Sequence, residues 1–195
     1  MNRMYVAGAL SLALSAPSWA AVEAYDIDKV HSEAGFQIRH LVSQVHGRFN
    51  DFAGSIQIDR DKPEASSVMF TAKTASVDTG NPKRDEDLRS PNFFDTAKLP
   101  EMSFKSTKIV AKDKDHFEVT GPLTLHGVTK DVTLKVSFGG FAKDPWGGER
   151  AGFDVTTTLN RKDFGMTWNK TLDAGGYLLG DEVQVQIAVE AVKKK

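Results

Sequence analysis

Five histidines are the residues in this sequence best suited to bind a metal ion or transfer a proton: His31, His40, His46, His116 and His126. None shows the HExxH or HxH spacing that places two imidazole rings on one metal ion. His31, His40 and His46 are close enough in sequence for a fold to bring them together. A metal-assisted hydrolase that uses these N-terminal histidines is therefore one hypothesis.

Carboxylates and serines offer less chemistry. Asp85, Glu86 and Asp87 are adjacent, and neighbouring side chains in a helical turn point apart, which makes a poor acid/base pair. They are better explained as the solvated first turns of a helix. The sequence contains no G-x-S-x-G elbow, P-loop or G-x-G-x-x-G motif. We predict no catalytic residue, no metal site and no cofactor.

Phenylalanine is the unusual feature, with twelve copies. Most of these residues lie on the apolar phase of alternating segments: Phe36, Phe52, Phe70, Phe104, Phe117, Phe138 and Phe153. Aromatic side chains dominate filled β-cores, and a filled core is the simpler interpretation. The wall of a ligand cavity is the alternative.

The elements that carry these side chains are strands. Apolar residues alternate with polar ones through 132–138 and again through 183–190, and this period of two indicates a strand with one buried face. The same pattern and the polar turns between its repeats predict eight main strands, near residues 34–41, 51–59, 66–77, 101–110, 116–125, 130–142, 150–160 and 181–192.

No long amphipathic helix is available to cover this sheet, so it must bury its apolar face against itself, as a closed barrel or a sandwich. Short sequential links favour an all-β, eight-stranded antiparallel up-and-down barrel, whose interior holds side chains or one small ligand. Asn81 and Pro82 predict a short helix over 81–88, through an N-cap and a proline at the first helical position. Residues 160–180 read as a long loop with one helical turn.

The N-terminus indicates export. A positive charge at Arg3, an uncharged run over 4–16 and small residues before a cut after Ala20 predict a cleaved signal peptide, 1–20. The remaining residues, 21–195, form one predicted domain with 24 basic residues after the loss of Arg3 and 26 acidic ones. This balance argues against nucleic acid as a partner. The absence of cysteine excludes disulfides, thiolate sites and a lipid-modified cysteine.

Several sequence blocks contain particular residues at fixed spacings, in addition to the alternation of apolar and polar residues. The longest runs Ser76-Val77-Asp78-Thr79-Gly80-Asn81, Arg84-Asp85-x-x-Leu88 and Ser90-x-x-Phe93-Phe94-Asp95. Others are Tyr25-x-Ile27-Asp28-x-x-His31-Ser32, Gly47-x-Phe49-x-x-Phe52-x-Gly54, Gly121-x-Leu123-Thr124-Leu125-x-Gly127-Val128-Thr129-Lys130 and Arg161-x-x-Phe164-Gly165. In these blocks the chain resembles the YceI family of periplasmic, polyisoprenoid- and lipid-binding, lipocalin-like proteins.

The resemblance implies an elongated barrel with short helices at its mouth and a periplasmic location. It also implies a ligand with a long isoprenoid chain, either a polyprenyl phosphate or an isoprenoid quinone, and suggests a membrane quinone-linked cytochrome as partner. It supplies no catalytic residue. A stress-related protein that shields apolar groups without one defined ligand is a third hypothesis. The chain could be a monomer or a dimer.

The candidate binding residues come from the inward phase of the strands and from the mouth. The wall candidates are Phe36, Ile38, Phe52, Ile56, Phe70, Phe104, Leu125, Val136, Phe138 and Phe153, and Phe94, Phe164 and Trp168 are expected to shape the mouth. Asn81 and Arg84 are the main candidates for a polar or anionic headgroup, with His126 and Lys130 as further ones. Arg84 and Asp85 have an alternative role, as an ion pair that holds the helix to the barrel rim.

Overall fold

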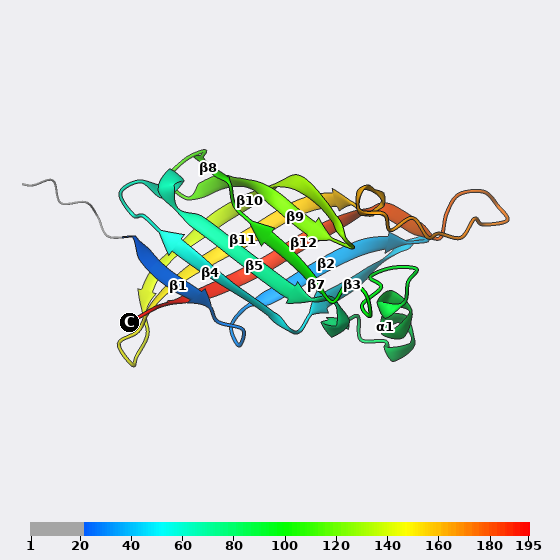
Figure 1. Cartoon of the computed structure of the whole chain (residues 1–195), viewed down its shortest axis with the longest axis horizontal. Helices are drawn as coiled ribbons and strands as arrows, with labels where there is room; N and C mark the ends of the chain where they lie inside the picture. The colour runs from blue at the N-terminus through cyan, green and yellow to red at the C-terminus, as the bar shows by residue number, and fades with distance from the viewer. Residues whose placement is uncertain (1–21) are drawn as a thin grey trace, which may run out of the picture.

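The computed structural model describes residues 22–195, and almost all of this part of the chain is β-structure (Figure 1). The predicted signal peptide lies outside the described residues. Within them, twelve strands form one sheet. The strands are β1 (Glu23–Ile27), β2 (Glu33–His40), β3 (Ser43–Phe49), β4 (Phe52–Ile58), β5 (Ser67–Lys73), β6 (Val77–Asp78), β7 (Glu101–Lys105), β8 (Lys108–Ala111), β9 (His116–Leu125), β10 (Val128–Lys143), β11 (Glu149–Asn160) and β12 (Leu179–Lys193).

The sheet closes into a barrel of eight strand positions over residues 22–195. Four positions each contain two consecutive strands: β1 with β2, β3 with β4, β5 with β6, and β7 with β8. Both β1 and β2 pair with β12, which closes the barrel, while β3 and β4 pair with β2 and β1. Every pairing is antiparallel, and apart from the closure at β12 each joins neighbouring positions along the chain. The predicted up-and-down barrel is confirmed.

The register puts the expected apolar residues on the inside. One layer crosses six strands through direct partners, from β9 to β3: Phe117, Val136, Val155, Ile187, Ala34 and Phe49. Because side chains alternate along a strand, one pairing register orients the whole inward set. The alternation in the sequence thus becomes a continuous inner wall.

Two strands were not predicted from the sequence, β1 and β3. Strand β3 reads SQVHGRF, and its inward phase passes through Gly47, which has no side chain to show the pattern. The structure explains this glycine, since a Cβ there would lie 2.4 Å from Cζ of Phe36. The predicted strands 66–77 and 101–110 are each interrupted. In the second, the chain approaches β9 so closely that a Cβ on Gly121 would lie 2.0 Å from the Lys105 carbonyl oxygen.

One α-helix occurs in the described part, α1 (Pro82–Arg89), and it starts as predicted, with the Asn81 side chain accepting a hydrogen bond from Arg84 N. Three short 3-10 helices are η1 (Pro63–Ala65), η2 (Thr74–Ser76) and η3 (Arg161–Phe164), the last within the predicted loop. Helix α1 and the loop that follows η3 lie at one end of the barrel, which we call the α1 end (Figure 1). The C-terminus lies at the opposite end. None of the described helices is long and apolar enough to cross a membrane.

Candidate functional site: an apolar cavity along the barrel

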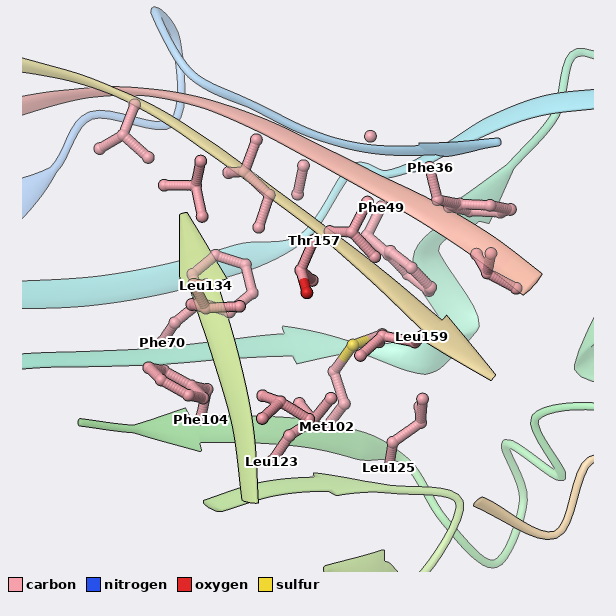
Figure 2. A pocket seen from close by; sticks show the side chains of 18 of the residues that line it. Phe36, Phe49, Phe70, Met102, Phe104, Leu123, Leu125, Leu134, Thr157 and Leu159 are labelled. Atoms are coloured by element: carbon pink, nitrogen blue, oxygen red, sulfur yellow. The ribbon is translucent and has the colours of Figure 1, made fainter. Parts of the chain in front are cut away.

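A cavity of about 1050 Å³ occupies the interior of the barrel. This volume is at the upper end of the range for small-molecule sites, about 300–1,000 Å³. Its lining runs from Arg60 and Pro63 near one end to Arg84 and Trp168 at the α1 end. Side chains from opposite walls point into it (Figure 2). The bore is therefore long, and it is built from carbon over most of its length.

The exposure of the wall residues distinguishes a cavity from a filled core. Along 132–136 of β10 the burial alternates between exposed outward residues and half-buried inward ones, Val132, Leu134 and Val136. These three line the cavity, so their remaining exposure is to the bore rather than to the outer solvent. A packed core would bury them fully. The apolar phase of the strands therefore forms a wall around open space.

Most of the predicted site residues line this cavity. They are Phe36, Ile38, Ile56, Phe70, Asn81, Arg84, Phe94, Phe104, Leu125, Val136, Phe138, Phe153, Phe164 and Trp168. Phe52 does not line it. This ring is buried behind the wall and stacks on Phe70, with their centroids 5.8 Å apart. Phe52 therefore supports the wall instead of facing a ligand.

The cavity also includes residues that were not among the predicted binding residues. Several have the same alternating pattern as the predicted ones: Phe117, Val119, Leu123, Val132, Leu134, Val155, Leu159, Val183, Val185, Ile187 and Val189. Thr157 places a hydroxyl among them (Figure 2) and donates it to the Thr133 carbonyl oxygen at 3.0 Å. Met166 and Phe93 come from irregular segments, where no periodic signal could have identified them, whereas Met102 alternates with Phe104 on β7.

Arg161 organises the α1 end of the bore. Its guanidinium is 3 % exposed and donates to the carbonyl oxygens of Gly180 (2.9 Å), Met166 (2.5 Å) and Trp168 (2.8 Å). It also meets Asp181 at 3.2 Å. Burial lowers the pKa of Arg161, but arginine stays charged at all ordinary pH values. One buried cation therefore fixes the loop that carries the mouth residues.

The loop held in this way carries Trp168 against Phe93, with ring centroids 5.3 Å apart. Phe94 packs edge-on against Phe49 at 5.4 Å. Phe164 is 2 % exposed, and its carbonyl oxygen accepts a hydrogen bond from the His126 ring. His126 thus has a structural role and does not line the cavity. Lys130 pairs with Asp163 and does not line the cavity either. The aromatic residues predicted at the mouth are there, whereas these two headgroup candidates are not.

Arg84 and Asp85 both bind Thr79, in place of the mutual ion pair considered as their alternative role. Arg84 Nε donates to Thr79 Oγ1 at 2.7 Å, and Arg84 Nη2 donates to the Thr79 carbonyl oxygen at 2.9 Å. Asp85 Oδ1 accepts from Thr79 N and Thr79 Oγ1. Thr79 follows β6 directly, so these bonds hold α1 to the rim. The Arg84 side chain also lines the cavity, beside the N-cap Asn81.

A polar cluster holds together the end of the barrel opposite α1. Tyr25 is fully buried and donates to Glu149 Oε1 at 2.6 Å, and burial raises its pKa. Arg60 pairs with Glu23 and Glu149 and lies over the Phe141 ring, 3.9 Å from its centroid. Arg60 and Phe141 both line the cavity. These charged groups form the polar boundary of the bore at this end.

The three N-terminal histidines do not converge. His31 precedes β2 and His40 ends it, so the length of the strand separates them, while His46 is exposed on β3. His31 lies near Asp28 and Glu190, but Arg150 already binds both carboxylates, at 2.8 and 2.5 Å. His31 and Arg150 hold the pKa of Asp28 well below its usual range. The Arg150 guanidinium thus bridges the two carboxylates beside His31.

Comparison with known proteins agrees with this architecture. Residues 25–191 match the YceI-like domain. The chain is 42% identical to a UPF0312 protein of Pseudomonas putida strain W619 over 198 residues, which covers 100% of both. A Campylobacter jejuni YceI protein is similar in structure, with a TM-score of 0.71 and 36% identity over 86% of this chain and 96% of that one. A polyisoprenoid binding domain from Saccharophagus degradans has a TM-score of 0.67 at 16% identity, covering 88% and 99%, and shares the fold.

Proposed function

Because this chain belongs to the YceI-like domain family, we propose that it is a binding protein that encloses the tail of one long-chain isoprenoid lipid in its barrel. The observation that carries this proposal is the apolar bore of about 1050 Å³ with a cationic side chain, Arg84, on its rim. The similar domain from Saccharophagus degradans is described as polyisoprenoid binding, which supports an isoprenoid chain.

The shape of the bore suits a long, flexible tail. Strand β10 lines the bore from Val132 to Phe141, and at about 3.3 Å per residue this stretch extends roughly 30 Å along the strand. Each buried CH₂ contributes about 0.8 kcal/mol, so about a dozen buried carbons yield roughly 10 kcal/mol before binding costs of about 4–15 kcal/mol. A longer tail supplies the surplus through apolar contact alone. Such a ligand needs an apolar wall and very few polar contacts, and the cavity is built in this way.

Export fits the same proposal. A signal peptide over 1–20 would deliver the barrel to the periplasm, where an isoprenoid tail needs an apolar enclosure to leave a membrane. Polyprenyl phosphates and isoprenoid quinones both have such tails, and a quinone would make a membrane quinone-linked cytochrome a natural partner. In each case the protein binds and carries the lipid without transforming it.

Lipid extracted from the protein provides the direct test. The chain, purified from its native compartment without detergent, should release a lipid of one mass or of one isoprenoid series, detected by mass spectrometry. Heterogeneous acyl lipids, or no lipid, would instead favour a protein that shields apolar groups without a defined ligand. That result would overturn the carrier proposal.

Arg84 should favour an anionic headgroup. Replacing Arg84 with alanine should weaken binding of a polyprenyl phosphate by about 2 kcal/mol, roughly thirtyfold, because a charge-assisted hydrogen bond is lost. Binding of the neutral polyprenol with the same chain should stay within about threefold, a difference of less than 1 kcal/mol. Titration of both lipids into the delipidated variant measures the two affinities.

The paired ligands are the internal control in this experiment. Any loosening of the Thr79 rim by Arg84→Ala affects both lipids alike, so only the difference between them reports on the headgroup. Arg84→Lys, which keeps the charge, should retain part of the preference for the phosphate. An equal loss for both lipids would show that Arg84 has only the structural role.

A further inference from the structure

The α1 end carries a small exposed apolar group, formed by Leu41, Val42 and Tyr177, which we call the apolar tip. Val42 is 93 % exposed and Leu41 41 %, in the turn between β2 and β3, and Tyr177 is 63 % exposed in the loop before β12. The two segments are joined by a hydrogen bond from Leu41 N to the Leu178 carbonyl oxygen, 2.9 Å long. Single exposed apolar residues are common, but three on adjoining segments indicate an interaction surface.

The backbone of this turn is strained in a way that presents the tip. Leu41 has a φ of 51°, in the left-handed region that glycine or asparagine occupies at little cost and leucine does not. A two-residue hairpin turn ordinarily contains those residues. A leucine in this conformation costs backbone energy, and the valine that follows it is almost fully exposed, so turn geometry does not explain either residue type. Such strain is characteristic of a functional segment.

The apolar tip adjoins the rim of the cavity. His40 and Leu178 line the cavity, and each is next in sequence to a residue of the tip. They are also close in space, because Leu179 is the direct partner of His40 in the sheet. The loop that carries Tyr177 extends beyond the barrel at this end (Figure 1). Apolar surface therefore continues from the inner wall of the bore to the outside.

We propose that the apolar tip docks onto the surface of a lipid bilayer, so that the rim of the bore faces the membrane and the tail enters without crossing water. This inference rests on the proposed binding of a membrane-derived tail. A protein partner fits less well, because a specific interface needs about 800 Å² on each side, more than three side chains supply. Shallow insertion of a few apolar side chains is enough for an interfacial contact.

Charge on the tip fits an anionic bilayer. Arg39 and Lys170 are exposed in the same two segments, and no ion pair engages either of them within the described part of the chain. Lys162 pairs with Asp181 and lies 5.8 Å from the Tyr177 ring centroid. Asp173 is the exposed acid in this loop. The two free cations lie where they can meet lipid phosphates while the apolar residues insert.

The experiment is flotation of the delipidated protein with vesicles of phosphatidylethanolamine and phosphatidylglycerol in equal parts. Val42→Asp should lower the partition coefficient about tenfold or more, because a carboxylate replaces a valine at the insertion point. Val30→Asp is the matched control, since Val30 is 84 % exposed in the turn between β1 and β2, away from the α1 end. Trp146→Asp tests the turn between β10 and β11, where Trp146 is 86 % exposed. Both controls should bind like the unmodified protein.

Leu41→Gly tests whether a loss of vesicle binding could result from misfolding of a variant. It removes an apolar side chain from the tip and also relieves the positive φ, so the variant should be at least as stable while its vesicle binding falls. Unchanged flotation of Val42→Asp and Leu41→Gly would overturn the docking proposal. Loss of binding in Val30→Asp or Trp146→Asp to the same degree would also overturn it, because the contact would then not be specific to the tip.

Tail binding is measured separately, with polyprenol presented in detergent micelles. A protein that binds the polyprenol but does not float with vesicles would refute docking and leave the proposed function intact. A protein that floats but takes up no polyprenol would refute the proposed function instead. Val42→Asp should keep its polyprenol affinity, because Val42 lies outside the bore.

Discussion

Thr157→Trp is expected to prevent a long tail from occupying the barrel while leaving the fold intact. Thr157 lies on the inner wall of β11, and Met102 and Phe104 lie on the opposite side of the bore (Figure 2). The interior of an eight-stranded barrel is only about wide enough for side chains or one ligand, so an indole at this position obstructs it. If the obstruction excludes about four methylenes, binding weakens by about 3 kcal/mol, more than a hundredfold.

The stability of this variant should change little. The substitution removes one hydrogen bond, from Thr157 to the Thr133 carbonyl oxygen, which is worth about 1 kcal/mol, and it adds apolar contacts in space that is otherwise open. Titration with a polyprenol measures the affinity, and denaturant unfolding measures the stability.

Thr158→Trp is the matched control for this prediction, because Thr158 is the next residue on the same strand and its side chain is exposed on the outer face. It should bind the tail like the unmodified protein. Equal affinity of the Thr157 and Thr158 variants for a long polyprenol would mean that the tail does not pass through the bore at β11. The route proposed for the tail would then be wrong.

Arg161→Met should cause the largest loss of stability among single changes at the α1 end. The guanidinium is almost completely buried, and it donates to two loop carbonyl oxygens, to the Gly180 carbonyl oxygen of β12 and to Asp181. Breaking a buried charged network of this kind costs about 3 kcal/mol or more. For a domain of this size, that corresponds to a decrease in Tm of roughly 10 °C. Thermal and denaturant unfolding of the variant measure both quantities.

Lysine is not an adequate substitute at this position. Its ammonium group cannot reproduce the planar fork that reaches Gly180, Met166 and Trp168 together, so Arg161→Lys should lose about 2 kcal/mol. The adjacent Lys162→Met is the control, because Lys162 also pairs with Asp181 but is exposed. It should cost less than about 1 kcal/mol, as is usual for surface ion pairs. Similar losses in the Arg161 and Lys162 variants would contradict the role assigned to Arg161.

The strands and the helix could be predicted where local sequence carries a periodic or capping signal. Residues 132–138 alternate without ambiguity, and Asn81 with Pro82 defines the start of α1. Strand β3 could not be predicted in this way, because its inward phase includes Gly47, whose missing side chain makes room for the ring of Phe36. A glycine that is needed to make room for a neighbouring side chain gives no periodic signal of its own.

The alternating pattern shows which residues point inward, but it does not distinguish residues of the cavity wall from residues packed behind that wall. Phe52 and Phe70 both follow the alternating rule, yet Phe70 lines the bore and Phe52 is buried against it. The role of Arg161 was not predicted for a similar reason. Its sequence neighbours are those of an ordinary polar loop, and its burial depends on carbonyl groups up to 19 residues away. Such roles depend on contacts made only after the chain has folded.

By itself, the sequence determined the all-β class of the fold and the apolar character of its interior, and it favoured a closed barrel over a sandwich because the links between strands are short. Only the tertiary structure decided that the interior is open. A filled core and a hollow bore place the same residue types on the same phase, and the difference lies in the barrel radius relative to the side-chain volumes. The tertiary structure also placed Leu41 and Val42 outside, at the rim, since exposure is a property of the folded surface and not of residue type.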